Sequence, residues 1–208
     1  NLLWLSCQTG WYLLDIRKGI QKRFWSKADD ETKIFGDEIQ YTYQDDDGIY
    51  WLATAYSGLV RVELSPSYEV ISTEQFTISE GLSSNTIYAI YEDDPDSYRD
   101  GFLWMSTNNG ISRFDKKTKE VQVFLEEDGL PHYEFNRLSN FQRADGTIFF
   151  GTLNGIVSFH PKDLSDKKAY NVPLKISRCE KFSNETEQMV NVTTDVVTKN
   201  KIVIAPNQ

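Results

Sequence analysis

The chain lacks most of the features that mark the common functional classes of protein. Only two of its 208 residues are histidine and two are cysteine, so a zinc site of paired cysteines and histidines is not expected. Its formal net charge is −9, and without a basic stripe it is not expected to bind nucleic acid or an anionic membrane surface. No apolar run approaches the roughly eighteen residues of a membrane helix. The chain begins inside a strand motif rather than a signal peptide, as expected for a segment of a longer protein.

Motifs that carry catalysis or cofactors are also missing. The sequence has no nucleophile elbow, phosphate loop, dinucleotide fingerprint or zincin motif, so we expect no catalytic residue and no cofactor. The two distant carboxylates of a glycosidase would leave no local pattern, and the enzyme hypothesis therefore stays open. The acidic runs at residues 45–47 and 92–96 lack the ligand spacing of a calcium loop. We interpret them as solvated turns and predict no metal, with calcium as the less favoured alternative.

One sequence motif recurs four times along the chain. An aromatic residue in a strand is followed by a short polar turn, a glycine and a second strand, with the anchors Trp4, Trp51, Trp104 and Phe149 spaced 47, 53 and 45 residues apart. A period near fifty with two strands in each motif predicts stacked sheets, most simply propeller blades. The tryptophans at this fixed position are interpreted as core between blades rather than as sugar-binding platforms.

The third repeat gives the clearest template for a blade. Strands are expected at residues 86–91, 102–107, 111–114 and 120–124, because these stretches are rich in β-branched and aromatic residues. Residues 108–110 supply the asparagines and glycine of a tight hairpin. The second repeat matches the template, with strands expected at residues 39–43, 50–54, 59–62 and 69–76.

The sequence therefore predicts an all-β fold with a partial propeller of about four blades, each of four antiparallel strands. The repeats are expected at residues 1–36, 37–79, 80–127 and 128–161, and the first lacks its innermost strand. After residue 161 the pattern ends. Residues 162–208 are predicted to hold a polar linker and the start of a small sandwich-like β domain, with strand candidates at residues 172–177 and 201–204.

Residues 80–87 and 103–115 resemble the two-component regulator propeller repeats almost end to end. Residues 128–161 are similar to the last repeat of that family, and residues 172–208 resemble the opening strands of the immunoglobulin-like domain, named for its tyrosines, that follows it. The resemblance implies the periplasmic sensor part of a membrane-anchored hybrid histidine kinase of gut Bacteroidetes. It implies carbohydrate fragments as signals and transcription as the output. A seven-bladed ring would need about three more blades.

Strand alternation brings the candidate ligand residues to one surface. The segments leading into the first strands and the hairpins between second and third strands share one end of the blades, which we call the top rim. Amide, imidazole and aromatic groups there suit a hydroxyl-rich ligand. The alternative is that the asparagines only satisfy turn geometry. The predicted ligand-binding residues are Trp11, Tyr56, Asn85, Asn108, Asn109, His132, Tyr133, Asn136 and Asn154.

Three functional hypotheses follow. The first is a non-catalytic, periplasmic sensor segment that binds an oligosaccharide and touches the membrane only through the rest of the protein. The second is a polysaccharide-active enzyme on a propeller scaffold. The third is an interaction module that self-associates through its blades or through the C-terminal β domain, because open sheet edges seek partners. Cys7 is interpreted as a small packed residue, with a disulfide or reactive role as the alternative for Cys7 and Cys179.

Overall fold

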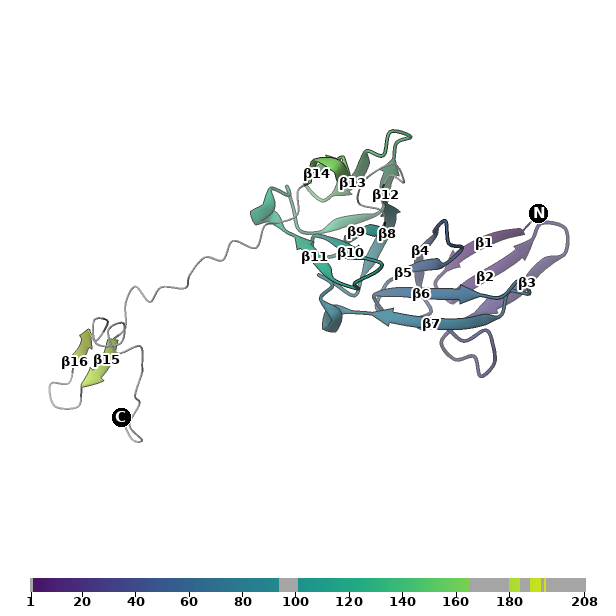
Figure 1. The fold of residues 1–208 in the computed structure, drawn as a ribbon, viewed down its shortest axis with the longest axis horizontal. Coiled ribbons are helices and arrows are strands. Elements are labelled where there is room, and N and C mark those ends of the chain that lie inside the picture. The colour runs from purple at the N-terminus through teal and green to yellow at the C-terminus, as the bar shows by residue number, and fades with distance from the viewer. Residues whose placement is uncertain (1, 94–100, 165–179, 184–187, 192, 194–208) are drawn as a thin grey trace. The chain divides into compact units, whose positions relative to one another are not determined.

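A computed structural model describes residues 2–93, 101–164, 180–183, 188–191 and 193 (Figure 1). Contacts divide the chain into two units, Asn1–Leu164 and Ser165–Gln208. The first unit holds four antiparallel sheets of three or four strands that follow one another along the chain. The all-β prediction with propeller-like blades is therefore confirmed.

The first and second sheets are formed by residues 2–76. Sheet 1 has three strands in the described residues. Sheet 2 has four strands in sequence order. The strands are β1 (Leu2–Cys7), β2 (Gly10–Asp15) and β3 (Gly19–Phe24) in sheet 1, and β4 (Ile39–Gln44), β5 (Tyr50–Thr54), β6 (Leu59–Leu64) and β7 (Val70–Phe76) in sheet 2.

The third and fourth sheets extend the same pattern. Sheet 3 has four strands, whereas sheet 4 has three among the described residues. Short 3-10 helices precede these sheets at Ile78–Glu80 (η1) and Glu126–Asp128 (η2), and η3 (Pro161–Asp163) follows them. The strands are β8 (Ile87–Glu92), β9 (Phe102–Thr107), β10 (Ile111–Asp115) and β11 (Val121–Phe124) in sheet 3, and β12 (Phe135–Gln142), β13 (Ile148–Thr152) and β14 (Gly155–Phe159) in sheet 4.

The hydrophobic core lies between the sheets. Each of three clusters joins one sheet to the next, so every junction is a separate layer of core. Between sheets 2 and 3, the indole of Trp51 meets the ring of Phe114 at a centroid distance of 5.7 Å. Between sheets 3 and 4, Trp104 meets Phe159 at 4.9 Å. Trp51 and Trp104 are both buried, which confirms that they are core rather than exposed platforms.

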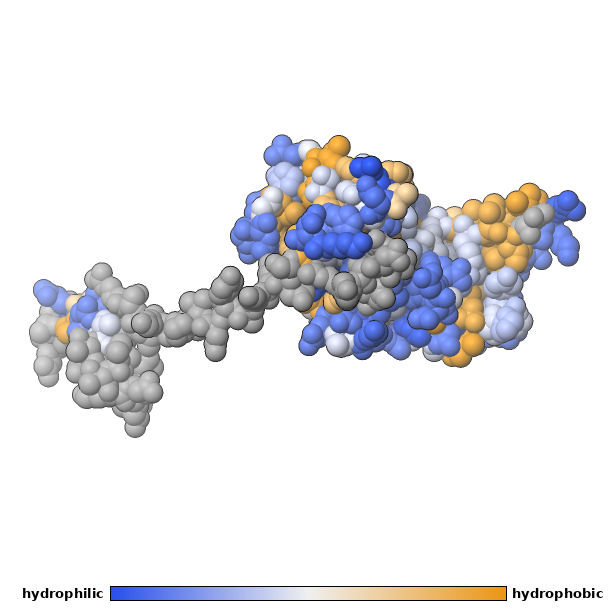
Figure 2. Space-filling model, turned by 45° about the horizontal axis from the view of Figure 1, so that its top comes forward, coloured by the Kyte–Doolittle hydropathy of each residue, from blue (hydrophilic) through white to orange (hydrophobic). Residues whose placement is uncertain are grey.

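The outward faces of the two terminal sheets remain apolar. Leu3 and Leu5 of β1 are partly exposed, whereas Tyr50 and Leu52 at the matching positions of β5 are buried. Figure 2 shows the resulting apolar patch over sheet 1, beside the N-terminus. These faces are apolar like the faces buried between sheets, but no sheet in the described residues packs against them.

The second unit departs from its predicted strands. It contains an antiparallel pair, β15 (Glu180–Ser183) and β16 (Gln188–Asn191). The sequence prediction was wrong here, because it assigned this stretch to a polar connection. Phe182, Met189 and Val190 give the short segments their β character. The predicted strands at residues 172–177 and 201–204 lie outside the described residues.

Candidate ligand-binding rim

The top rim is built by backbone hydrogen bonds that repeat from sheet to sheet. Within sheet 2 the amide of Ala55 donates to the carbonyl of Glu38 at 3.0 Å. Between sheets, the amide of Gly58 donates to the carbonyl of Asn85 at 2.9 Å, and the amide of Gly110 donates to that of Tyr133 at 2.6 Å. Each hairpin is thus fixed to the segment that leads into the next sheet.

Two of these hairpins require glycine. Gly58 has a φ of +73° and Gly110 a φ of +86°, conformations that side chains disfavour. A Cβ at Gly58 would also come within 3.0 Å of the carbonyl oxygen of Phe76, and one at Gly110 would meet that of Phe124 equally closely. The glycine of the recurring motif therefore lets the hairpin lie against the end of the outer strand.

The side chains of the rim asparagines form hydrogen bonds that join separate segments of the rim. The Asn85 carboxamide oxygen accepts from the amide of Ile78 at 2.9 Å. The side chains of Asn109, Asn136 and Asn154 donate to the carbonyls of Ser83, Thr152 and Pro131. Asn108 accepts a hydrogen bond from the hydroxyl of Tyr88 at 3.1 Å. These bonds join the asparagines to other segments of the rim and not to the backbone of their own turns.

Among the aromatic candidates, the prediction that Trp11 binds ligand was wrong. Its side chain is 0% exposed and stacks on Trp4 with 3.8 Å between ring centroids, so it belongs to the core between sheets 1 and 2. It follows the hairpin glycine, but β2 turns its side chain toward sheet 2 rather than outward. Tyr56, by contrast, is 77% exposed.

His132 and Tyr133 form a second aromatic feature of the rim. Their rings stack with centroids 4.4 Å apart. The Nδ1 atom of His132 accepts from the amide of Glu134 at 3.0 Å, which fixes the ring at the entrance to β12. Tyr133 is exposed and presents an apolar ring with a polar tip to solvent.

Of the predicted residues, Tyr56 lines a cavity on the top rim. The cavity has a volume of about 390 Å³ and lies where sheets 1 and 2 meet. The carboxylate of Asp37 accepts from the amide of Ser26 at 2.7 Å and from its hydroxyl at 2.9 Å. The complete lining is polar apart from the Tyr56 ring and one glycine, and consists of Gln8, Ser26, Gly36, Asp37, Glu38, Thr54, Tyr56 and Ser57. An aromatic ring therefore stands beside several hydrogen-bonding groups.

Asn136 lies elsewhere, in a groove on the outward face of sheet 4. The predicted residues thus divide into three places. Tyr56 is at the junction of sheets 1 and 2, whereas Asn85, Asn108 and Asn109 are associated with sheet 3 and the segment that leads into it. The residues associated with sheet 4 are His132, Tyr133, Asn136 and Asn154.

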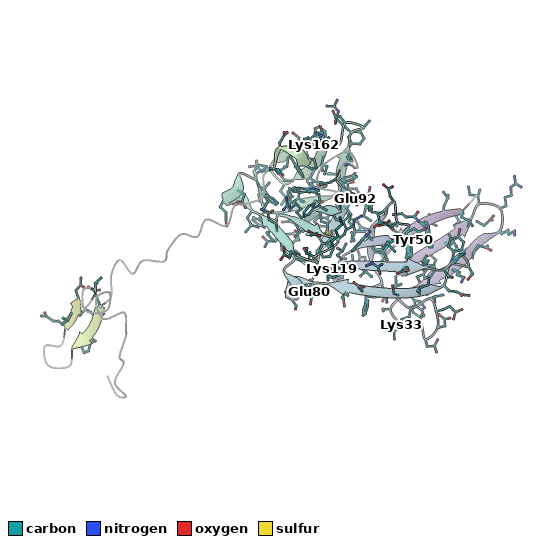
Figure 3. All side chains as sticks on the ribbon, viewed as in Figure 1. Lys33, Tyr50, Glu80, Glu92, Lys119 and Lys162 are labelled. Atoms are coloured by element: carbon teal, nitrogen blue, oxygen red, sulfur yellow. The ribbon has the colours of Figure 1, made fainter. Side chains whose placement is uncertain are left out.

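The opposite surface carries a charged cluster that the sequence prediction did not select. At the junction of sheets 2 and 3, the ammonium of Lys116 contacts the carboxylate of Asp45 at 3.3 Å and also pairs with Glu92. The hydroxyl of Tyr43 donates to Glu92 at 2.7 Å. Figure 3 shows Glu92 and Lys119 where these two sheets meet. We call Asp45, Lys116, Glu92 and Tyr43 the bottom cluster.

The electrostatics of the bottom cluster follow from its burial and pairing. Burial alone would lower the pKa of Lys116, but the hydrogen bonds and charges of Glu92 and Asp45 together raise it. Burial, followed by the hydrogen bond to Glu92, raises the pKa of Tyr43 well above its usual value. The cluster therefore holds a charged lysine and a neutral tyrosine at neutral pH. It borders a cavity of about 520 Å³.

The tryptophan anchors of sheets 2 and 3 have matched acceptors. The indole of Trp51 donates to Asp45 at 2.9 Å, and the indole of Trp104 donates to Asp93. Both aspartates follow the first strand of their sheet directly. In sheet 4 the two positions are Phe149 and Arg143, so the N–H donor and the carboxylate acceptor are replaced together. A buried indole N–H needs an acceptor, whereas phenylalanine needs none.

The acidic turns and the cysteines carry other side chains that could bind a metal ion or react. Within the described ranges, no three His, Cys, Asp or Glu side chains are grouped as a metal site. Part of the acidic run at residues 92–96 lies outside those ranges. Cys7 is half-buried with a free thiol, and Cys179 lies outside the described residues. No helix in the described part of the chain is long and apolar enough to cross a bilayer.

Comparisons with known proteins place this geometry in context. No protein-family model matches the chain, so the propeller-repeat family stays a prediction. A stretch of 85 residues, 41% of the chain, is 32% identical to "Histidine kinase P4" of Formosa agariphila, and the match covers 6% of that protein. The chain thus corresponds to a small part of this relative.

Two solved structures match the chain to different degrees. The extracellular domain of the putative hybrid two component system BT4673 from B. thetaiotaomicron matches with a TM-score of 0.61 and 19% identity, over 79% of this chain and 22% of that one. The corresponding domain of BT3049 from the same organism has a TM-score of 0.45 and 20% identity, over 91% of this chain and 31% of that one. The BT4673 match shows that the sheets of this chain are arranged as in part of that extracellular domain.

Proposed function

We propose that the chain is a periplasmic, ligand-sensing segment of a hybrid sensor histidine kinase, and that its ligand is a carbohydrate fragment. The observation that carries the sensor assignment is the match to "Histidine kinase P4" at 32% identity over 85 residues. The shared fold with the BT4673 extracellular domain supports the same assignment. The kinase activity and a transcriptional output belong to the rest of the protein.

The ligand class is inferred from the cavity at Tyr56. Its exposed ring offers an apolar face on which a sugar ring can stack, and the neighbouring carboxylates and hydroxyls accept or donate hydrogen bonds to sugar hydroxyls. The carboxylate of Asp37 is held in place by Ser26, so it is ordered before a ligand arrives. Such preorganisation lowers the entropy lost on binding.

Binding at this position favours one arrangement of sheets 1 and 2. The cavity is lined by residues of the two sheets and of the loop between them, so a ligand in it contacts both sides of the junction. A ligand that binds one arrangement more tightly shifts the population toward it. We propose that this shift, rather than turnover of the ligand, is the signal.

A panel of plant and host oligosaccharides tests the proposal. Each is incubated with the chain, binding is measured by calorimetry, and the solution is then checked for products by chromatography. The proposal predicts saturable binding of at least one member with no product. Consumption of a glycan would replace it with the enzyme hypothesis.

A matched pair of variants locates the site. Tyr56→Ala removes the exposed ring of the cavity and is expected to weaken binding at least tenfold, since a stacked ring contributes about 0.5–1.5 kcal/mol in addition to the apolar area that it buries. Phe141→Ala removes another exposed aromatic ring, on sheet 4, and is expected to leave binding unchanged. Equal weakening in both variants would show that the ligand does not bind at the Tyr56 cavity.

A further inference from the structure

The cavity at Tyr56 carries charge of one sign. The carboxylates of Asp37 and Glu38 line it, and among the described residues of its wall there is no lysine, arginine or histidine. The other polar side chains of the wall are neutral. A charged group that enters such a cavity loses water, and a partner of opposite charge offsets that loss. The wall therefore favours a cationic group over an anionic one.

The Asp37 carboxylate is held by neutral donors. Its Oδ1 atom accepts from the amide of Ser26 at 2.7 Å, and its Oδ2 atom accepts from the hydroxyl of Ser26 at 2.9 Å. Neither donor carries a charge, so these bonds orient the carboxylate without compensating it. Asp37 is therefore a fixed negative charge in the wall of the cavity.

The Glu38 carboxylate has a cationic partner that comes from a different sheet. The Nη1 atom of Arg137, in β12 of sheet 4, lies 3.7 Å from the Oε1 atom of Glu38. The carboxamide of Gln40 donates to the same oxygen at 3.1 Å. The side chain of Arg137 is 46% exposed and that of Glu38 is 23% exposed. A long ion pair in contact with water contributes little, so a ligand cation can replace Arg137 at small cost.

We propose that this cavity selects sugars by charge, binding a sugar with a free amino group most tightly, a neutral sugar less tightly and a uronic acid least. The inference rests on the proposed function, because it places the bound sugar in the cavity at Tyr56. Glu38 is the specificity-determining residue. The ammonium group of an amino sugar pairs with it in place of Arg137, whereas the carboxylate of a uronic acid meets the like charges of Asp37 and Glu38.

The methyl glycosides of glucose, glucosamine and glucuronic acid are the probes, together with the same three derivatives of galactose. The members of each set share a ring and differ in charge. Each is titrated at millimolar concentrations into the 208-residue chain, and binding is followed by nuclear magnetic resonance of the backbone amides of Thr54, Tyr56 and Ser57. We expect the amine of a set to bind at least tenfold more tightly than the uronate. Added salt is expected to narrow this ratio, because it screens charges.

Three variants assign the selection to the cavity. Glu38→Gln keeps the length of the side chain but removes its charge, and is expected to lower the amine-to-uronate affinity ratio about threefold or more. Arg137→Gln removes the competing cation and is expected to raise that ratio. Glu31→Gln changes the net charge equally, but this exposed residue does not line the cavity, so the ratio is expected to stay unchanged. If Glu38 were only structural, its variant would weaken all members of a set equally.

Three results would overturn the inference. A uronate that binds the parent chain as tightly as the neutral sugar of its set would remove the charge selection, while the cavity would stay the ligand site of the proposed function. An equal change of the ratio in Glu31→Gln and Glu38→Gln would assign the selection to the net charge of the chain. Absence of amide shifts in the cavity with all six glycosides would also overturn the inference, whereas the oligosaccharide panel decides the proposed function separately.

Discussion

The top and the bottom of the same two sheets are held together by different chemistry. On the top rim, sheets 2 and 3 are linked by the backbone hydrogen bond from Gly58 to Asn85. At the bottom, the same sheets are linked by the ion pair of Lys116 with Asp45 and by the hydrogen bond from Tyr43 to Glu92. The top link repeats between sheets 3 and 4. At the bottom, the hydrogen bond from Tyr43 to Glu92 has a counterpart from Tyr91 to Asn140 between sheets 3 and 4, whereas in the described residues the Lys116 ion pair with Asp45 lies at the junction of sheets 2 and 3.

This difference indicates on which surface the side chains are not needed to hold the sheets together. Backbone links leave the rim side chains available, so that a residue such as Tyr56 is exposed without cost to the junction. At the bottom the side chains are themselves the link. A ligand surface is therefore expected at the top, and a fixed junction at the bottom.

The largest effect is expected at the top hairpin. Gly58→Ala combines a left-handed φ with a collision against Phe76, and we expect the free energy of unfolding to fall by about 3 kcal/mol or more. Gly155→Ala is the control, because it keeps the positive φ but meets open space, and its cost is expected near 1–2 kcal/mol. Denaturant unfolding measures both. Equal costs would show that the close approach to Phe76 contributes nothing.

Breaking the bottom cluster is expected to cost somewhat less. Lys116→Met leaves Asp45 and Glu92 without their cation in a half-buried site, and we expect a loss of about 2–3 kcal/mol in the free energy of unfolding. Lys117→Met, at the neighbouring position of the same exposed turn, is expected to change it by less than about 0.5 kcal/mol. A stabilised Lys116→Met variant would contradict the proposed role of the cluster.

The bottom cluster also predicts a pH dependence. Because the pKa of Lys116 is raised in the folded chain, its contribution is fully present below the unfolded value of about 10.4 and is lost as the pH rises through the folded value. The free energy of unfolding is therefore expected to fall more steeply above about pH 10 in the parent chain than in Lys116→Met. Parallel curves would show that Lys116 does not contribute to the alkaline loss of stability.

The indole–carboxylate pair gives a smaller effect. Trp51→Phe keeps an aromatic ring but removes the N–H that donates to Asp45, and we expect a cost of about 1–2 kcal/mol. Phe149→Trp is the reverse change in sheet 4, where Arg143 replaces the aspartate, and is expected to bring no gain. A stabilising Phe149→Trp would show that the indole does not need the matched carboxylate.

The smallest effect on stability is expected at the proposed ligand site. Tyr56→Ala removes a side chain that is largely solvated, so the free energy of unfolding is expected to stay within about 0.5 kcal/mol of the parent value. Thermal unfolding of both chains measures this. A larger loss would mean that Tyr56 supports the hairpin rather than a ligand.

The sequence predicted the structural features that recur in each repeat and missed contacts that occur at a single junction. The strand periodicity located sheets 2 and 3 with shifts of one or two residues, because β-branched runs, hairpin asparagines and glycines recur in each repeat. The pairing of Lys116 with Asp45 and Glu92 joins two turns and the end of a strand that are distant in sequence, and no local pattern encodes it. Trp11 shows a similar limit, since its position beside a hairpin did not reveal which way its side chain points.

The second unit shows where weak patterns fail. Phe182 and Val190 lie in strands of only four residues each. Neither strand is a strong apolar run, and the sequence between them carries no turn motif. Segments so short carry too few alternations to distinguish a strand from a polar connection. Strand alternation predicted that the hairpins lie at one end of the sheets. The cavity at Tyr56 depends on how sheets 1 and 2 pack together, which no local pattern encodes.

Calorimetric titration of the parent chain and of Tyr56→Ala with the oligosaccharide panel tests the central claim most directly. The account predicts saturable heat for at least one oligosaccharide, no product, and at least tenfold weaker binding by a variant whose stability is unchanged. Equal affinity of the two chains, or no heat from any member of the panel, would contradict the assignment of the top rim as a carbohydrate-binding surface.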